Sequence, residues 1–299
     1  MPVGVGPLLR QWRERRRISQ LDLAISADVS ARHVSFIETG RSRPSAAMIL
    51  RLAEELDVPV RERNALLVAA GHAPAYPESS LDEPALAPLR AAIDQLLRGY
   101  EPFPALVFDA GYDVVAANQA VSIMLDGVAG QLLEPPMNVM RLALHPDGLA
   151  PRITNLLQVR EHLLHRISRH LDTWQSDRLR ALYDEVSAYP VPAGEPSSGQ
   201  ETAFALPIRL LRGDTELSLI SAVATFNTPL DVTVSELAIE TFLPADPETA
   251  ALLQPPQPDG LQRGEPGDDG RLGRDPHHAR GREVQRSGRQ DGEAGDDPA

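Results

Sequence analysis

The chain has 299 residues, a length typical of about two domains, and 42% of its residues are hydrophobic, which excludes a wholly disordered protein. It has no cysteine, so disulfide scaffolds, zinc–thiolate fingers, iron–sulfur clusters and cysteine nucleophiles are excluded. The net charge of −13 is unevenly distributed: residues 1–75 carry 11 arginines and 8 acidic residues, whereas residues 76–255 carry 11 arginines and 24 acidic residues. A basic N-terminal segment followed by an acidic one indicates that the N-terminal segment has an anionic partner.

The sequence has neither of the segments that direct a chain to a membrane. Its first residues lack the basic stretch and apolar run of a signal peptide, and nowhere do 18 apolar residues follow one another. We therefore expect a cytoplasmic protein with no membrane partner.

Apolar residues recur at helical spacing in five short runs near the start of the chain. These runs are Pro7–Arg16, Gln20–Ala27, Ala31–Thr39, Ala46–Leu56 and Arg61–Ala70. Ser19 and Ser30 each stand where an N-cap belongs, directly before a run. Residues 1–72 are therefore expected to form an all-α domain of five helices.

The period of the apolar residues changes after residues 73–86, a linker rich in Pro, Ser and acidic residues. Short apolar runs flank Asp109-Ala110-Gly111 and Arg212-Gly213-Asp214, which predicts two hairpins. Helices are predicted over 87–97, 119–124, 153–171 and 178–187, and strands over 105–108, 114–117, 202–211, 216–226 and 237–242. This order predicts an α+β domain with a mostly antiparallel sheet over residues 87–255.

The last segment, residues 256–299, is dominated by Gly, Pro, Asp and Arg and has no aromatic residue. Such a composition buries too little apolar surface to offset its ordering entropy, so we expect a disordered tail.

The most specific pattern in the chain lies within the expected five-helix domain. It reads Ser19-Gln20-x-x-Leu23-Ala24-x-x-Ala27-x-Val29-Ser30-x-x-x-Val34-Ser35-x-Ile37-Glu38-x-Gly40-x-Ser42-x-Pro44-Ser45, followed by Leu52-Ala53-x-x-Leu56-x-Val58. Ala24 supplies the small residue needed where two helices cross, and Leu21 and Ile25 share its face, so all three are expected to be buried. The pattern resembles the helix-turn-helix of the phage-repressor-like (XRE) family, which implies a sequence-specific DNA-binding transcription regulator.

The resemblance assigns roles around a recognition helix at Ala31–Thr39, whose first turn would enter the major groove of an operator duplex. The residues expected at or near base edges are Ser30, Ala31, Arg32, His33 and Ser35. Those expected to contact phosphates are Gln20, Arg41 and Arg43. The alternative is that the arginines form only a solvated basic face.

Arg13 and Glu38 are expected to pair inside the five-helix domain of residues 1–72, which we call the head. The resemblance implies contact between these positions, and a Glu facing the groove would be repelled by phosphate. The head's excess of 3 positive charges is modest for a DNA-binding domain. Strong binding is therefore expected to need two heads on one duplex, in a homodimer.

Five blocks of the second domain occur in an order that resembles the MmyB-like ligand-binding domain, a PAS-like sensor. They begin Tyr100-Glu101-Pro102-Phe103-Pro104, Tyr112-Asp113-Val114-Val115, Asn138-Val139-Met140-Arg141, Thr225-Phe226-Asn227-Thr228-Pro229 and Glu240-Thr241-Phe242-Leu243-Pro244. The resemblance implies that a small apolar molecule, with a fatty acid as one candidate, lies between the sheet and its helices and alters DNA binding. No other cofactor is expected.

Nine residues are candidates for contact with that ligand. The apolar ones are Leu106, Val107, Met124, Met140, Leu142, Leu219 and Ile220. The polar ones are Asn118 and Arg141, and Arg141 would suit a carboxylate. Each apolar residue is also compatible with an ordinary core, and the polar ones with a helix cap or a surface ion pair.

Two alternative functions stay open. The second domain could serve only for dimerisation or partner docking, which a dry core without a cavity of roughly 300 Å³ would favour. It could instead be an autoregulating enzyme, which a pocket with convergent titratable groups would favour. The chain lacks the common nucleophile, phosphate-loop and zinc-protease motifs, so no enzyme is expected. His162, His165 and His170 do not share one helical face, so no metal site is expected.

Overall fold

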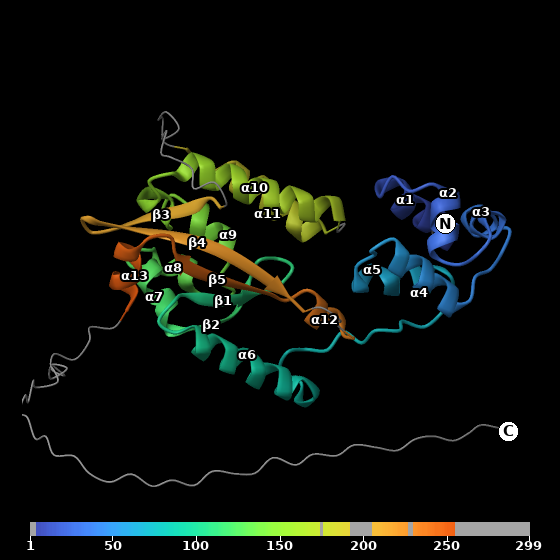
Figure 1. Cartoon of the computed structure of the whole chain (residues 1–299), viewed down its shortest axis with the longest axis horizontal. Coiled ribbons are helices and arrows are strands. Elements are labelled where there is room, and N and C mark those ends of the chain that lie inside the picture. The colour runs from blue at the N-terminus through green and yellow to red at the C-terminus, as the bar shows by residue number, and fades with distance from the viewer. Residues whose placement is uncertain (1–3, 174–175, 192–204, 227–229, 255–299) are drawn as a thin grey trace, which may run out of the picture. The chain divides into compact units, whose positions relative to one another are not determined.

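The computed structural model describes residues 4–173, 176–191, 205–226 and 230–254. The predicted tail at 256–299 and the first residues of the strand predicted at 202–211 lie outside this part of the chain. Within it, five helices are followed by further helices around a five-stranded sheet (Figure 1). The prediction of an all-α domain followed by an α+β domain is confirmed.

The head consists of the five predicted helices, each within two residues of its predicted bounds. They are α1 (Val5–Arg15), α2 (Gln20–Ser26), α3 (Ala31–Glu38), α4 (Ala46–Glu55) and α5 (Val60–Ala69). The hydroxyl groups of Ser19 and Ser30 accept hydrogen bonds from the backbone N–H groups of Asp22 and His33. Both serines are therefore N-caps, as predicted.

The head is held by one apolar core, but the buried face of α2 differs from the prediction. Leu21 and Ile25 are 59% and 69% exposed, whereas Leu23, Ala24 and Ala27 are buried. The prediction of burial for Leu21 and Ile25 was wrong because α2 carries two apolar stripes. Helical period alone does not say which stripe meets the other helices.

A buried ion pair joins α1 to α3. Arg13 Nε donates to Glu38 Oε1 at 2.6 Å, and Arg13 Nη2 donates to Glu38 Oε2 at 3.0 Å. Gln20 Nε2 at the start of α2 also donates to Glu38 Oε2, at 2.8 Å. The predicted pairing of Arg13 with Glu38 is confirmed, and the carboxylate ties three helices together.

The backbones of α1 and α3 touch at Gly6. A Cβ atom at this position would lie 2.5 Å from the carbonyl oxygen of Ile37 and 2.6 Å from that of Glu38. Real Cβ atoms do not approach backbone oxygens so closely, so only glycine fits while the helices keep this contact.

The second domain has helices of different lengths on both sides of a sheet. Its helical elements are η1 (Pro84–Leu86), α6 (Ala87–Tyr100), η2 (Gln119–Val121), α7 (Ser122–Leu125), α8 (Gly130–Leu133), α9 (Val139–Leu144), η3 (Ala150–Arg152), α10 (Leu156–Thr173), α11 (Asp177–Ser187), α12 (Val232–Ser235) and α13 (Pro247–Leu253). Its strands are β1 (Ala105–Phe108), β2 (Val114–Ala117), β3 (Pro207–Arg212), β4 (Thr215–Thr225) and β5 (Ala238–Pro244). No described helix combines the length and the apolar character needed to cross a bilayer.

The strands follow the order β2–β1–β5–β4–β3, and each neighbouring pair is antiparallel. Leu106 and Phe108 of β1 face a core built with α7, α9 and α10. Ala105 and Val107, which alternate with them, face α6 on the other side of the sheet (Figure 1). The two faces therefore have separate cores, and only the larger one lies between the sheet and several helices.

The segment predicted as a linker is anchored by hydrogen bonds at two points. Asn64 Oδ1 of α5 accepts from the N–H of Tyr76 at 3.1 Å. Asp231, the N-cap of α12, accepts from the N–H of Ser79 at 3.1 Å. Residues 73–86 therefore follow a defined path.

The Arg13–Glu38 pair yields a stability prediction. Glu38→Gln leaves the Arg13 guanidinium buried without its counter-charge, so the free energy of unfolding of the head should fall by about 3 kcal/mol or more. Trp12 fluorescence during urea unfolding, in a Trp174→Phe background, reports on this core. As a control, Glu14→Gln removes the exposed pair with Arg10 and should leave the midpoint almost unchanged. Equal effects of the two substitutions would contradict the prediction.

Candidate nucleic-acid interface and ligand pocket

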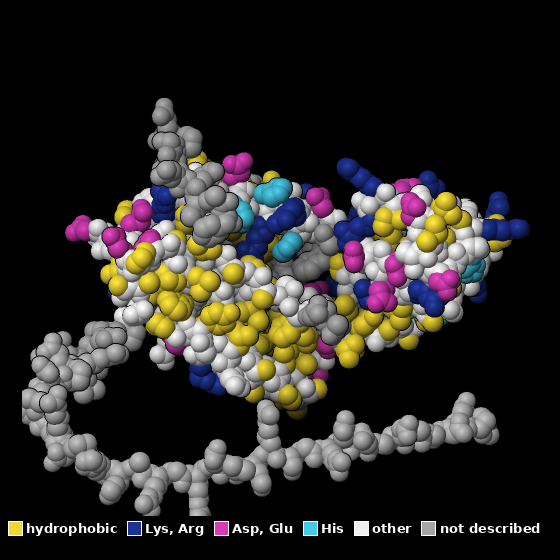
Figure 2. Space-filling model, in the orientation of Figure 1, with side chains coloured by type: hydrophobic (Ala, Val, Ile, Leu, Met, Phe, Trp, Pro, Cys, Tyr) yellow, Lys and Arg dark blue, Asp and Glu magenta, His cyan; other side chains and the backbone are white. Residues whose placement is uncertain are grey.

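The exposed side of α3 carries a cationic and aromatic surface. The guanidinium of Arg32 lies 5.0 Å from the centre of the Phe36 ring, and that of Arg41 lies 6.0 Å from it. Arg32, Arg41 and Arg43 are all exposed. Figure 2 shows arginine side chains projecting from the surface over α1 and α3. The ring orients two of the guanidinium groups without neutralising their charge.

The other predicted DNA-binding residues lie on or beside the same helix. Ser30 is the N-cap of α3, and Ala31, His33 and Ser35 are partly exposed in its first two turns. Gln20 stands at the start of α2, where one amide N–H is bound to Glu38. A side-chain amide has two N–H donors, so the second remains for the predicted phosphate contact.

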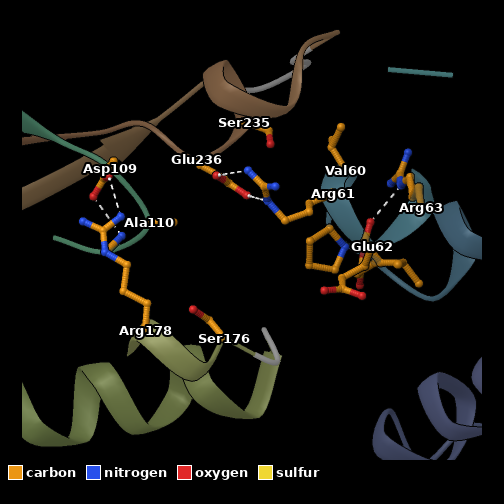
Figure 3. A pocket seen from close by; sticks show the side chains of 14 residues that line it. Val60, Arg61, Glu62, Arg63, Asp109, Ala110, Ser176, Arg178, Ser235 and Glu236 are labelled. Carbon is orange, nitrogen blue, oxygen red and sulfur yellow. Dashed lines mark hydrogen bonds and ion pairs between the residues drawn. The ribbon is translucent and has the colours of Figure 1, made fainter. Parts of the chain in front are cut away.

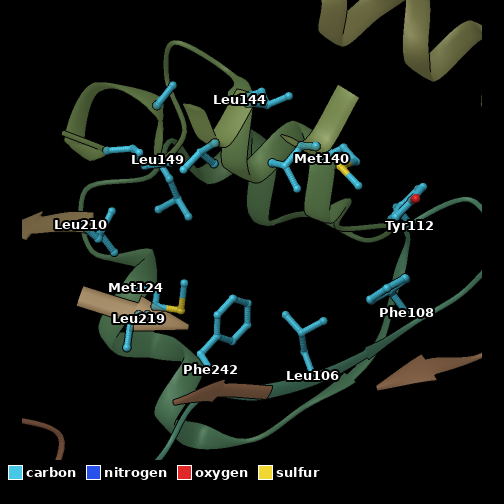
Figure 4. Close-up of a cluster of buried hydrophobic side chains, with 14 of the residues drawn as sticks. Leu106, Phe108, Tyr112, Met124, Met140, Leu144, Leu149, Leu210, Leu219 and Phe242 are labelled. Carbon is cyan, nitrogen blue, oxygen red and sulfur yellow. The ribbon is translucent and has the colours of Figure 1, made fainter. Parts of the chain in front are cut away.

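Between the sheet and its helices lies an almost wholly apolar cavity of about 60 Å³. Its lining residues are Leu106, Val121, Met124, Leu125, Met137, Val139, Leu142, Ala143, Leu149, Ile153, Val159, Leu163, Ile208, Glu240 and Phe242. Figure 4 shows Leu106, Met124 and Phe242 facing Met140 and Leu149 across this core.

The predicted ligand-binding residues divide into three groups. Leu106, Met124 and Leu142 line the cavity. Met140 and Leu219 are buried in the surrounding core but are not among its lining residues. Val107 and Ile220 are the third group.

Val107 and Ile220 lie on the opposite face of the sheet, so their assignment to the cavity was wrong. Val107 packs in the core that α6 covers, and Ile220 pairs with Leu243 rather than facing the cavity. Successive side chains of a strand point to opposite faces. Leu106 and Val107 therefore cannot line one cavity, and neither can Leu219 and Ile220.

Neither predicted polar ligand contact reaches the cavity. Asn118 Oδ1 accepts from the N–H of Ala105 at 3.0 Å, and its Nδ2 donates to the Phe103 carbonyl at 2.8 Å. Arg141 makes a bidentate pair with Glu185, at 2.8 and 2.7 Å. Both side chains are structural here, and Arg141 is not placed to hold a carboxylate inside the core.

The polar group that does line the cavity is Glu240 of β5, which the sequence analysis missed. Glu240 is 3% exposed, and its partner Arg166 on α10 is 8% exposed. Arg166 Nη1 lies 3.2 Å from Glu240 Oε1, and Ser221 Oγ donates to the same oxygen. A single acid within an apolar strand, opposite an arginine at a core-facing helical position, is the signal that could have revealed the pair.

A second polar group lies beside this pair. The hydroxyl of Tyr112 and Nδ1 of His170 are hydrogen-bonded at 2.8 Å, and the two rings stack with centres 5.5 Å apart. Burial, together with Arg166 and Arg169, lowers the pKa of His170 from 6.5 to about 4. Burial also raises the pKa of Tyr112 to about 12. Both side chains are therefore neutral at pH 7, and His170 Nδ1 is engaged by the hydroxyl of Tyr112.

A larger, polar pocket of about 570 Å³ is lined by the start of α5, residues 109–111, the start of α11 and the end of α12 (Figure 3). Arg61 donates to Glu236 at 2.5 Å and to Glu78 at 2.7 Å. Arg178 pairs with Asp109 at 3.5 Å. These titratable groups cancel one another as ion pairs, which is typical of a structural contact. No group of three potential metal ligands occurs in the described ranges.

Comparison with known families assigns both halves of the chain. Residues 5–66 match a helix-turn-helix domain, and residues 89–255 match the ligand-binding domain of MmyB-like transcription regulators. The chain belongs to the MmyB-like transcription regulators. This regulator thus combines a DNA-binding helix-turn-helix with a ligand-binding domain.

Two individual proteins match different shares of this MmyB-like regulator. It is 39% identical over 74 residues to the uncharacterized HTH-type transcriptional regulator RghRB of Bacillus subtilis (strain 168), a match over 24% of the chain. The match spans about half, 51%, of that relative's length. An RNA-binding light-oxygen-voltage receptor of known structure matches 82% of the chain and 59% of its own, with 12% identity and a TM-score of 0.27. That score is too low to support an argument.

The environment of His170 predicts how stability depends on pH. The pKa of about 4 in the folded protein lies below the unfolded value of about 6.5, so the unfolded chain binds more protons between these values. The stabilisation is complete above pH 6.5 and is lost as the pH falls toward 4. His170→Gln should reduce that loss by about 1–2 kcal/mol, allowing for partial exposure, in urea unfolding at pH 7 and 4.5. Exposed His165→Gln on the same helix is the control, and parallel pH profiles for both variants would refute the assignment.

Proposed function

We propose that this regulator binds an operator as a homodimer and that a small apolar molecule in its second domain changes its operator affinity. The observation that carries the proposal is the apolar cavity between sheet and helices, in a domain whose family is defined by ligand binding. Thermodynamically, a ligand acts only through different affinities for the DNA-competent and DNA-incompetent states, so the operator must also alter ligand affinity.

For DNA recognition we propose that specificity and affinity come from different arginines. Arg32 extends from the first turn of α3, the part of a recognition helix that reaches base edges. Arg41 and Arg43 follow the helix, where the chain would run along the phosphates. The second domain's acidic charge does not oppose this, because charges beyond about 8 Å are largely screened at physiological salt.

This division of labour can be measured by operator titrations across a salt series. Arg32→Ala should relax discrimination between operator and mutated sites, since a bidentate base contact is worth roughly 1–3 kcal/mol. Arg41→Ala should weaken binding to all sequences alike and reduce the salt slope by about one unit. Both arginines contact Phe36, so each substitution removes one such contact and the two variants are matched in this respect. If the two variants behave identically, the proposed roles are wrong.

For the ligand we propose an apolar molecule, of which a fatty acid is the candidate that the sequence suggested. The cavity of about 60 Å³ is far smaller than the roughly 300 Å³ of an ordinary ligand pocket. Binding must therefore displace core side chains. Met124 and Met137 are suited to this because unbranched thioether chains repack at low cost.

Expansion of the cavity on ligand binding offers a route by which the ligand could act on the head. Glu240 lines the cavity from β5, and Glu236, just before that strand, is bonded to Arg61 of α5. A ligand that shifts β5 would therefore act on the contact that Glu236 makes with the helix-turn-helix domain. The supporting observation is this continuity of contacts, and it requires two states of β5 that the ligand distinguishes.

The small cavity also favours a second candidate function, in which the second domain binds no small molecule and only dimerises or docks a partner. An enzyme is favoured less, since Arg61, Arg178, Asp109 and Glu236 of the larger, polar pocket are engaged in ion pairs. Native mass spectrometry of the purified protein separates the first two possibilities: it reports the mass of the dimer and any retained small molecule.

Filling the cavity provides the decisive test of sensing. Leu106→Trp should block the space between β1 and α9 and abolish the ligand response of operator affinity, while DNA binding stays measurable. Val107→Trp, on the opposite face of the same strand, controls for the cost of overpacking, about 1–3 kcal/mol in either core. Retention of the ligand response by Leu106→Trp, or its equal loss in both variants, would contradict a ligand site in this cavity.

A further inference from the structure

We propose that the cavity selects apolar alcohols, molecules with a neutral hydroxyl head, over carboxylates and amines of the same length. This inference rests on the proposed ligand-binding function and replaces its fatty-acid candidate with an alcohol of the same chain length. It depends on Glu240, the one charged side chain among the described residues that line the cavity, which is an acceptor of hydrogen bonds.

Glu240 has unused capacity to accept a hydrogen bond. A carboxylate offers about four acceptor positions on its two oxygens. Oε1 accepts from Ser221 Oγ and from Arg166 Nη1, whereas the bond described for Oε2 is a long one of 3.4 Å from the same Arg166 nitrogen. In this proposal Oε2, the less engaged oxygen, is the acceptor for a hydroxyl placed in the cavity that Glu240 lines.

The charge of the site is already balanced. Arg166 neutralises Glu240, and the guanidinium also lies over the rings of Phe108 and Tyr112, at 5.2 and 5.5 Å. A carboxylate head would bring a second negative charge against Glu240, and an ammonium head would bring a second positive charge against Arg166. Either would leave an unbalanced charge in a buried, apolar place, which is costly.

The remaining lining explains why the rest of the ligand should be apolar. Apart from Glu240, the described lining consists of aliphatic, methionine and phenylalanine side chains. A ligand that lacks a donor would leave the remaining acceptor position of Glu240 unused and would gain no hydrogen bond from it. A neutral donor on an apolar chain is therefore the best match for this wall.

Four probes of equal size test the selectivity: 1-octanol, heptyl methyl ether, octanoate and octylamine. At pH 8 the ether lacks the donor, and the acid and amine are charged. Binding to the full-length protein is measured by calorimetry and by the shift in melting temperature. We expect 1-octanol to bind about tenfold more tightly than each of the others, the effect of one hydrogen bond to a charged acceptor.

Substitution of the acceptor should remove the preference. In Glu240→Gln the site gains a net positive charge, so the affinity for octanoate relative to that for 1-octanol should rise by about tenfold. The double variant Arg166→Met/Glu240→Gln has no net charge at the site and should bind the alcohol and the ether with equal affinity. It keeps the test possible if the single variant folds poorly. Glu248→Gln, an exposed acid at the start of α13, removes the same charge away from the cavity and should keep the wild-type order.

The outcomes separate the two proposals. Octanoate or the ether binding the wild type as tightly as 1-octanol would overturn the alcohol selectivity while leaving ligand sensing intact. An unchanged order of affinities in both Glu240 variants would overturn the role of this carboxylate. If none of the four probes bound, the ligand-sensing proposal and the selectivity would fall together.

Discussion

A carboxylate buried in the central strand of the sheet constrains the architecture of the second domain. Glu240 lies on β5, which has a strand on each side, so it cannot reach water and must be paired within the protein. Arg166 supplies the counter-charge from α10 and Ser221 supplies a hydroxyl donor from β4. The pair thereby fixes where the longest helix of this domain crosses the sheet, and the cavity lies beside that crossing.

The head uses the same chemistry for a different purpose. Glu38 is paired with Arg13 and bonded to Gln20, so one carboxylate sets the mutual positions of the first three helices. In the head the three hydrogen bonds that Glu38 accepts come from α1 and α2, and the result is a rigid support for α3. In the second domain the acceptor borders free volume, so the same kind of pair can take part in recognition.

Local sequence signals predicted much of the fold. The strands 105–108 and 114–117 were predicted at their observed bounds, because a turn sequence separates two short apolar runs. The short helix α9 at Val139–Leu144 was missed because it has fewer than two turns and shows no helical period of its own. Burial of Leu21 was predicted wrongly because two apolar stripes compete on α2, and only tertiary contacts decide between them.

The cavity was harder to predict than the fold. Its lining comes from strands and helices that are far apart in the sequence, and a side chain's face depends on strand register, which single-sequence patterns leave open. Alternation along a strand allows only one residue of each adjacent pair, Leu106 or Val107 and Leu219 or Ile220, to line the cavity, and the tertiary packing decides which one does. Arg141 was misassigned because its partner Glu185 lies on another helix, and a charge pair between distant segments has no local sequence signature.

The glycine contact between α1 and α3 has a consequence for how an operator could be read. Because the two backbones touch at Gly6, α3, the proposed recognition helix, cannot tilt toward α1 to follow an irregular groove. The DNA, and not the protein, must then change its shape for the two surfaces to fit. Sequences that bend or narrow easily would be favoured even at base pairs that no side chain touches, so the stiffness of the duplex becomes part of the recognised signal.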